Sequence, residues 1–107
     1  MLVLFDHGTP RGLARLLVGH TIRVARAQGW DTLSNGELLA QAEAAGFDVL
    51  VTPDKNIRYQ QNLEGRNIAI VVLGNPLWPI VRLHGELVLS AVNAAMPGSY
   101  TEVDIPG

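Results

Sequence analysis

The chain has 107 residues, of which 48% are hydrophobic, and it contains no cysteine. This composition supports one folded domain over residues 1–107 and excludes a disulfide framework, a thiolate nucleophile and a thiolate metal site. The net charge of −2 argues against a protein dominated by nucleic-acid binding, and no apolar run reaches the roughly 18 residues of a membrane span. We therefore expect a cytoplasmic protein without a membrane segment.

The first part of the chain predicts a strand, a helix and a second strand. Residues 2–5 are a continuous apolar run, as in a strand that is buried on both faces. Thr9 before Pro10 predicts a helix start, with Thr as the N-cap residue and Pro at the first helical position. Leucines follow at helical spacing, and Gly19 ends that helix. Residues 21–25 are the second expected strand.

The middle of the chain predicts a second helix and a third strand. Ser34 and Glu37 have the spacing of a capping box, and Gly46 is placed to end the helix that they begin. Residues 48–52 are the third expected strand. Residues 57–63 are expected to form a helical turn or a short helix.

The last part of the chain predicts a strand, a long helix and a final strand. Residues 67–73 are again apolar on both faces, residues 77–96 carry a wide apolar face, and residues 100–105 alternate like an edge strand. The apolar surplus of the long helix would be covered by a homodimer or another partner, or the helix is simply well buried. Alternating strands and helices indicate an α/β fold, a parallel sheet with right-handed crossovers and helices on both faces.

Acidic and amide side chains are expected at one end of this sheet. Asp6 directly follows the first strand, and Asp54 comes two residues after the third, with Asn56 close behind. Glu37 lies in the first turn of a helix that begins at the same end. Because ligands of open α/β sheets bind outside the carboxyl ends of the strands, these side chains are expected to converge. Their oxygens suit Mg²⁺ or Mn²⁺, which would polarise a phosphodiester and activate a water molecule.

Each of these residues also has a purely structural interpretation. Asp6 and Asp54 are ordinary turn residues, and Glu37 completes a capping box with the serine before it. His7, beside Asp6, is either a ligand or proton carrier or an exposed turn residue. For any one of these residues considered alone, the structural interpretation is the stronger expectation.

Two arginines are the candidate contacts for a phosphate backbone. Arg11 and Arg15 are four residues apart, which places them on one face of the first expected helix, close to the acidic residues. Simple solvation is the alternative for each of them.

Four segments of the sequence carry a family resemblance. They are Leu-Phe-Asp6-His-Gly-Thr-Pro10, Asn35-Gly-Glu37-Leu-Leu39, Phe47-Asp-Val-Leu-Val-Thr-Pro-Asp54-Lys-Asn56 and Tyr59-Gln-Gln-Asn62-Leu63. In this order they resemble the compact PIN-like domain family, small relatives of the VapC-type toxin nucleases. The resemblance implies a PIN-like three-layer α/β/α sandwich with a mainly parallel five-stranded sheet.

The resemblance also implies a function, a metal-dependent endoribonuclease that acts as the toxin of a toxin–antitoxin pair. Its catalytic and metal-binding residues would be Asp6, Glu37 and Asp54, with Mg or Mn as cofactor. Asn35, Asn56 and His7 would support them. Arg11 and Arg15 would bind the RNA, and an antitoxin-like protein would be a partner.

Two departures from the family pattern favour an alternative function. Asn35 stands where relatives often carry Asp, and Asn56 stands where a second acid of an Asp-x-Asp pair would be. Amides in place of carboxylates remove negative charge and weaken the binding of divalent ions. The alternative is a non-catalytic PIN-like binding or regulatory module. A small hydrolase that acts on a phosphorylated metabolite is a third, weaker hypothesis.

Overall fold

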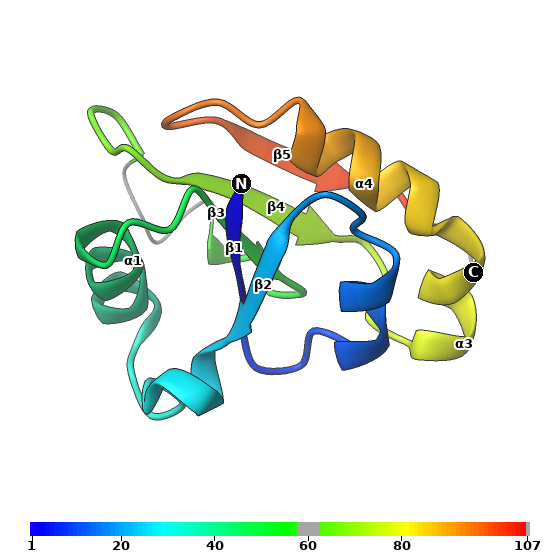
Figure 1. Ribbon diagram of the computed structural model, residues 1–107, viewed down its shortest axis with the longest axis horizontal. Helices are drawn as coiled ribbons and strands as arrows, with labels where there is room; N and C mark the ends of the chain where they lie inside the picture. Colours follow the sequence, from blue (N-terminus) through cyan, green and yellow to red (C-terminus); the bar gives the residue numbers. More distant parts are fainter. Residues whose placement is uncertain (58–62, 107) are drawn as a thin grey trace.

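A five-stranded, all-parallel sheet forms the centre of the computed structural model, which describes residues 1–57 and 63–106 (Figure 1). The strand order is β2-β1-β3-β4-β5, so β5 is an edge strand as predicted. The predicted α/β class with a parallel sheet is confirmed. The strands are β1 (Leu2–Phe5), β2 (Thr21–Val24), β3 (Val49–Thr52), β4 (Ala69–Leu73) and β5 (Tyr100–Val103).

Each face of the sheet has its own apolar core. Successive side chains of a strand point to opposite faces, so Val3 and Phe5 join one core while Leu4 joins the other. All residues of β3 and β4 are buried, which is why both strands are continuous apolar runs. The first core is covered by η1 (Arg11–Arg15), α3 (Trp78–Val81) and α4 (Gly85–Asn93), and the second by α1 (Asn35–Ala44).

The first and last crossovers of the sheet have opposite hands. The β1–β2 connection passes through η1 and the β4–β5 connection through α3 and α4, all of which pack on the same core. These two connections lead toward opposite edges of the sheet. For connections between parallel strands that pass over the same face of a sheet, the handedness reverses when the direction across the sheet reverses. One of the two therefore departs from the right-handed rule that the sequence led us to expect.

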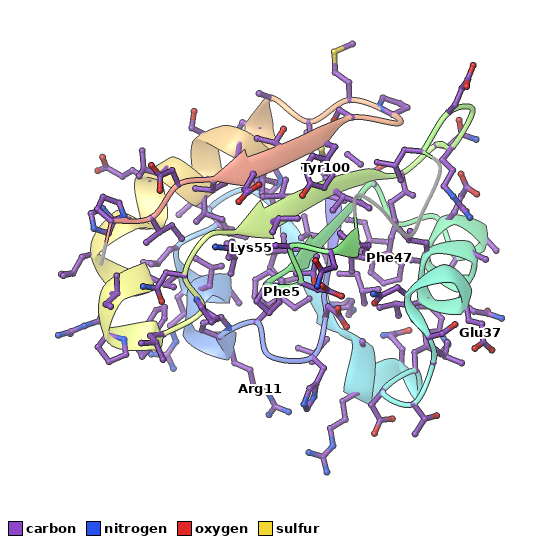
Figure 2. The ribbon with its side chains drawn as sticks, turned by 180° about the vertical axis from the view of Figure 1, so that it is seen from behind. Phe5, Arg11, Glu37, Phe47, Lys55 and Tyr100 are labelled. Atoms are coloured by element: carbon purple, nitrogen blue, oxygen red, sulfur yellow. The ribbon has the colours of Figure 1, made fainter. Side chains whose placement is uncertain are left out.

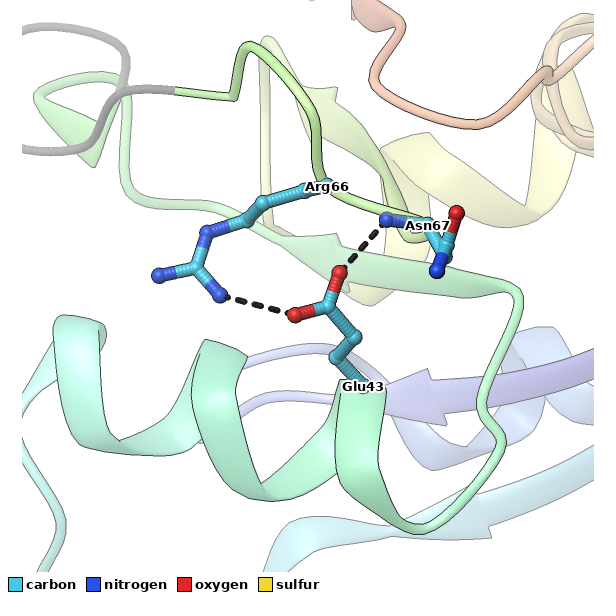
Figure 3. Close-up of polar contacts among 3 residues, drawn as sticks. All are labelled: Glu43, Arg66 and Asn67. Atoms are coloured by element: carbon cyan, nitrogen blue, oxygen red, sulfur yellow. Dashed lines mark hydrogen bonds and ion pairs between the residues drawn. The ribbon is translucent and has the colours of Figure 1, made fainter.

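Helix α1 begins and ends as predicted. Ser34 is the N-cap residue and forms the full capping box with Glu37, while Gly46, at φ 88°, follows the C-terminal end. Near its end, Glu43 reaches across to the segment before β4 (Figure 3). Its carboxylate accepts hydrogen bonds from the Arg66 guanidinium over 3.2 Å and from the Asn67 backbone N–H over 2.5 Å. This contact ties α1 to the strand that follows.

The first predicted helix is instead a short 3-10 helix, η1, and its predicted cap is wrong. Pro10, not Thr9, is the N-cap residue, and no side chain caps η1. The Thr9 hydroxyl points inward and donates to the Val51 carbonyl oxygen over 3.0 Å. Because a 3-10 helix has about three residues per turn, Arg11 and Arg15 lie about 120° apart around its axis. The prediction that they share one helix face is therefore wrong.

The predicted long helix over residues 77–96 is divided into three pieces. α3 is followed by η3 (Arg82–His84), and α4 then begins at Gly85. A Cβ atom on Gly85 would lie 2.6 Å from the Leu16 Cδ1 atom, so the missing side chain lets the start of α4 approach the end of η1. Another 3-10 helix, η2 (Ala25–Gln28), follows β2. None of the described helices has the length and apolar character that crossing a membrane requires. The predicted helical turn over 57–63 lies largely outside the described residues.

Candidate functional site

A single hydroxyl joins two acidic residues at the carboxyl ends of β1 and β3. Thr52, at the end of β3, is fully buried and donates its hydroxyl proton to the Asp6 Oδ2 atom over 2.9 Å. The same Thr52 oxygen accepts the Asp54 backbone N–H over 3.1 Å. The chain leaves β1 toward one edge of the sheet and β3 toward the other, so these residues lie at the topological switch point.

The hydrogen-bond network that begins at Asp6 and Thr52 continues through Asp54 to the start of α1. The Asn35 side-chain amide donates to the Asp54 Oδ2 atom over 2.8 Å, and the Asn56 backbone N–H donates to the Oδ1 atom over 2.9 Å. At the other end of the network, the His7 backbone N–H donates to the Asp6 Oδ1 atom over 2.7 Å. Every carboxylate oxygen of the two aspartates thus accepts a hydrogen bond from the protein.

The three predicted supporting residues contribute in different ways. Asn35 acts through its side chain, and it is partly buried. His7 and Asn56 contribute backbone N–H groups, while both residues are exposed. The turn interpretation of the Asp54 segment, in which the side chain accepts from the backbone two residues on, describes this geometry.

Glu37 lies outside the network of Asp6, Thr52, Asp54 and Asn35. Its carboxylate accepts from the Ser34 hydroxyl over 2.8 Å and from the Ser34 backbone N–H over 3.3 Å. Figure 2 shows Glu37 on the outer side of α1, away from the strands. In the part of the chain that the structure describes, no three His, Asp or Glu side chains form a group that could hold a metal ion. The implied set of three carboxylate ligands does not fit these described residues.

A cavity of about 200 Å³ lies beside the network, between the loop after β1 and the residues after β2. Asp6, His7 and Arg11, from the loop after β1 and from η1, line this cavity. Arg26, from η2, and Asp31 line it as well. Arg15 is not among the residues that line this cavity, because η1 turns its side chain away from Arg11.

Sequence reasoning about the site missed Arg26 and Asp31. Both follow β2, whose carboxyl end lies at the same end of the sheet as Asp6. The rule that placed Asp6 and Asp54 at this end applies equally to residues after β2. Applied to the second strand, it would have included both.

The fold and the site together define an α/β domain with a polar hydrogen-bond network at the switch point of a parallel sheet. Comparison with the models of known protein families finds no match to this chain, and neither curated proteins nor solved structures match it. Membership of the PIN-like family therefore stays a prediction that rests on the sequence motifs.

Proposed function

We propose that this chain is a non-catalytic PIN-like module that binds RNA at the carboxyl end of its sheet. The observation that carries the proposal is the hydrogen bond from the Asn35 amide to the Asp54 carboxylate. An amide at this position adds a donor where a metal site would need a further negatively charged ligand. The carboxylate oxygens of Asp6 and Asp54 all accept hydrogen bonds from protein donors, as they would in a purely structural network.

The charges around the acidic pair also favour a binding role. Arg11 and Arg26 line the adjoining cavity, and neither guanidinium group makes a hydrogen bond or ion pair within the described part of the chain. Unpaired guanidinium groups suit the phosphates of a nucleic-acid backbone. They oppose the approach of a divalent cation, since like charges repel. Because arginine–phosphate contacts release counterions, we expect RNA binding that weakens as salt is added.

A second candidate function is the metal-dependent endoribonuclease, acting as a toxin with an antitoxin-like partner. It is favoured by the link between Asp6 and Asp54 through Thr52, because Mg²⁺ is often held by one or two carboxylates together with water. Leu83 and Leu87, 72% and 45% exposed, would lie in the surface that an antitoxin or a second copy of the chain covers. Either function would operate in the cytoplasm, where RNA is present.

One experiment with two measurements separates these functions. A labelled single-stranded RNA is titrated with the protein in EDTA, and Mn²⁺ is titrated into the protein by calorimetry. The proposal expects RNA binding in EDTA that Arg11→Ala weakens and that the matched control Arg15→Ala leaves nearly unchanged. It also expects no RNA cleavage when Mn²⁺ is added.

Other results would overturn the proposal. RNA cleavage in Mn²⁺ that an Asp6→Asn/Asp54→Asn double variant abolishes would establish the nuclease instead. Mn²⁺ binding by the wild type, lost in that variant and accompanied by cleavage, would support the same conclusion. Absence of RNA binding at low salt would contradict the binding module.

A further inference from the structure

We infer that the cavity beside Asp6 binds a ribonucleoside phosphate, with the phosphate between Arg11 and Arg26 and the ribose hydroxyls at Asp31. The inference rests on the proposed function and names the part of an RNA that would occupy this cavity, its terminal nucleotide. The same chemistry is presented by a free nucleotide.

Charged residues from separate elements of the fold line one cavity. Arg11 comes from η1, Arg26 comes from η2, and Asp31 comes from the turn after η2. All three line the cavity of about 200 Å³. All three residues are exposed. Arg11 and Arg26 are far apart in the sequence, and the parallel pairing of β1 with β2 brings them to the same end of the sheet.

These three charged side chains form no ion pairs with one another. The ion pair found among the described residues joins Arg66 to Glu43, far along the chain. The side chains of Arg11, Arg26 and Asp31 form no hydrogen bond or ion pair with any other described residue. Three residues that line one cavity thus have charged groups without a partner among the described residues, and these groups are available to a ligand.

A ribonucleoside phosphate matches these three groups in charge and in hydrogen bonding. A guanidinium binds phosphate oxygens with two parallel hydrogen bonds, and two guanidinium groups balance the charge of about −1.5 to −2 on a phosphate monoester. A carboxylate such as Asp31 accepts hydrogen bonds from the neighbouring ribose hydroxyls, as acidic residues do in nucleotide sites. Asp31 also repels a second phosphate. The cavity therefore suits one phosphate with its sugar rather than a run of several nucleotides.

The loop after β1, which lines the cavity, is held in place by hydrogen bonds and by close packing. The Thr9 backbone N–H donates to the Asp6 carbonyl oxygen over 3.1 Å, and the Thr9 hydroxyl anchors the loop to β3. Gly8 has a φ of 89°, and a Cβ atom there would lie 3.2 Å from the Pro53 Cγ atom. A loop that is ordered before binding costs less to order when a ligand arrives.

The test is a calorimetric titration of the whole chain with 5′-AMP, 2′-deoxy-5′-AMP and adenosine. We expect 5′-AMP to bind, adenosine to bind at least about tenfold more weakly, and the deoxynucleotide to lie between them. Arg26→Ala should weaken 5′-AMP at least about tenfold, whereas the matched control Arg15→Ala should not. Asp31→Asn should remove the preference for ribose over deoxyribose while phosphate binding remains. Unchanged thermal unfolding of these exposed variants shows that they are folded.

The results that overturn the inference are separate from those that overturn the proposed function. The inference that the cavity is a nucleotide site would be contradicted if 5′-AMP does not bind at millimolar concentration. It would also be contradicted if the wild type and Arg26→Ala bind 5′-AMP equally. A second arm compares RNAs that carry a 5′-phosphate or a 5′-hydroxyl. Equal binding of both RNAs, with Arg26→Ala unchanged, overturns the terminal-nucleotide inference and leaves the proposed RNA binding intact. Binding of 5′-AMP without binding of either RNA assigns the cavity to a free nucleotide and overturns the proposed function.

Discussion

The Asn35 side-chain amide donates a hydrogen bond to the Asp54 carboxylate over 2.8 Å and so ties the first residue of α1 to the loop after β3. Through Thr52 the same network reaches Asp6 at the end of β1. A neutral donor at position 35 gives the Asp54 carboxylate a hydrogen bond and adds no negative charge beside the two carboxylates at the switch point. The stability of the network is therefore sensitive to the charge at that position.

Asn35→Asp should destabilise the protein at neutral pH. It replaces a hydrogen bond to Asp54 by the repulsion of two carboxylates, and we expect the free energy of unfolding to fall by about 1–3 kcal/mol. Because this repulsion needs both groups to be ionised, the loss should be smaller at acidic pH. Urea unfolding at neutral and at acidic pH measures both values.

The control for this variant is Asn35→Ala, which removes the hydrogen bond without adding charge and should show a weaker dependence on pH. The negative charge gained in Asn35→Asp should also raise the affinity for Mn²⁺ above that of the wild type. Equal stability of the Asp and Ala variants at all pH values would contradict the repulsion argument.

Thr52→Val should destabilise the protein although the two side chains have nearly the same shape. The hydroxyl of this fully buried residue donates to the Asp6 carboxylate and accepts from the Asp54 backbone N–H. Loss of both bonds leaves polar groups without these partners, so we expect the free energy of unfolding to fall by about 1–3 kcal/mol. Chemical denaturation with a linear extrapolation measures this difference.

Thr101→Val in β5 is the matched control for Thr52→Val. Thr101 is a strand residue whose hydroxyl makes no hydrogen bond to the other described residues, so its loss should be close to neutral. The network would be energetically unimportant if both variants changed the stability equally.

Glu43→Gln should loosen the connection between α1 and the segment before β4. The Glu43 carboxylate accepts from Arg66 and from the Asn67 backbone N–H, and the side chains of the ion pair are only 25% and 27% exposed. We expect a loss of about 1 kcal/mol, because hydrogen bonds to a charged acceptor are stronger than those to a neutral one. The difference should shrink as salt is added.

Arg66→Gln provides the comparison, since it removes the ion pair but leaves the bond from the Asn67 N–H to Glu43. Its effect on thermal unfolding should be smaller than that of Glu43→Gln. A larger effect of Arg66→Gln would mean that the backbone contact contributes little.

Gly12→Ala should destabilise the protein by overpacking. A Cβ atom on Gly12 would lie 2.5 Å from the Trp78 Cζ2 atom, and the indole ring is rigid. Inserting a methyl group into such a contact costs about 1–3 kcal/mol. Denaturant unfolding followed by tryptophan fluorescence and by circular dichroism measures it.

A double-mutant cycle gives the control for Gly12→Ala. In a Trp78→Leu background the shorter side chain leaves room for the methyl group, so the same substitution should cost much less. An unchanged cost in that background would place the strain somewhere other than the contact with Trp78.

Local patterns in the sequence determined the strands and the second helix. Residues 2–5 and 67–73 are apolar at every or nearly every position because a parallel strand is buried on both faces, and that pattern can be recognised without a structure. The capping box at Ser34 and Glu37 is likewise complete within four residues. The position of Asp6 and Asp54 at one end of the sheet followed from strand order and the parallel rule.

Only the tertiary structure decided how these elements meet. The break at Gly85 reflects its close approach to Leu16, and the inward turn of Thr9 reflects an acceptor in β3. Such contacts join residues that are far apart in the chain, so no local sequence pattern predicts them. The same is true of the link from Asp54 to Asn35 and of the cavity shared by Arg11 and Arg26. Hydrogen bonds and packing across the sheet, not spacing along the chain, select which polar residues form the site.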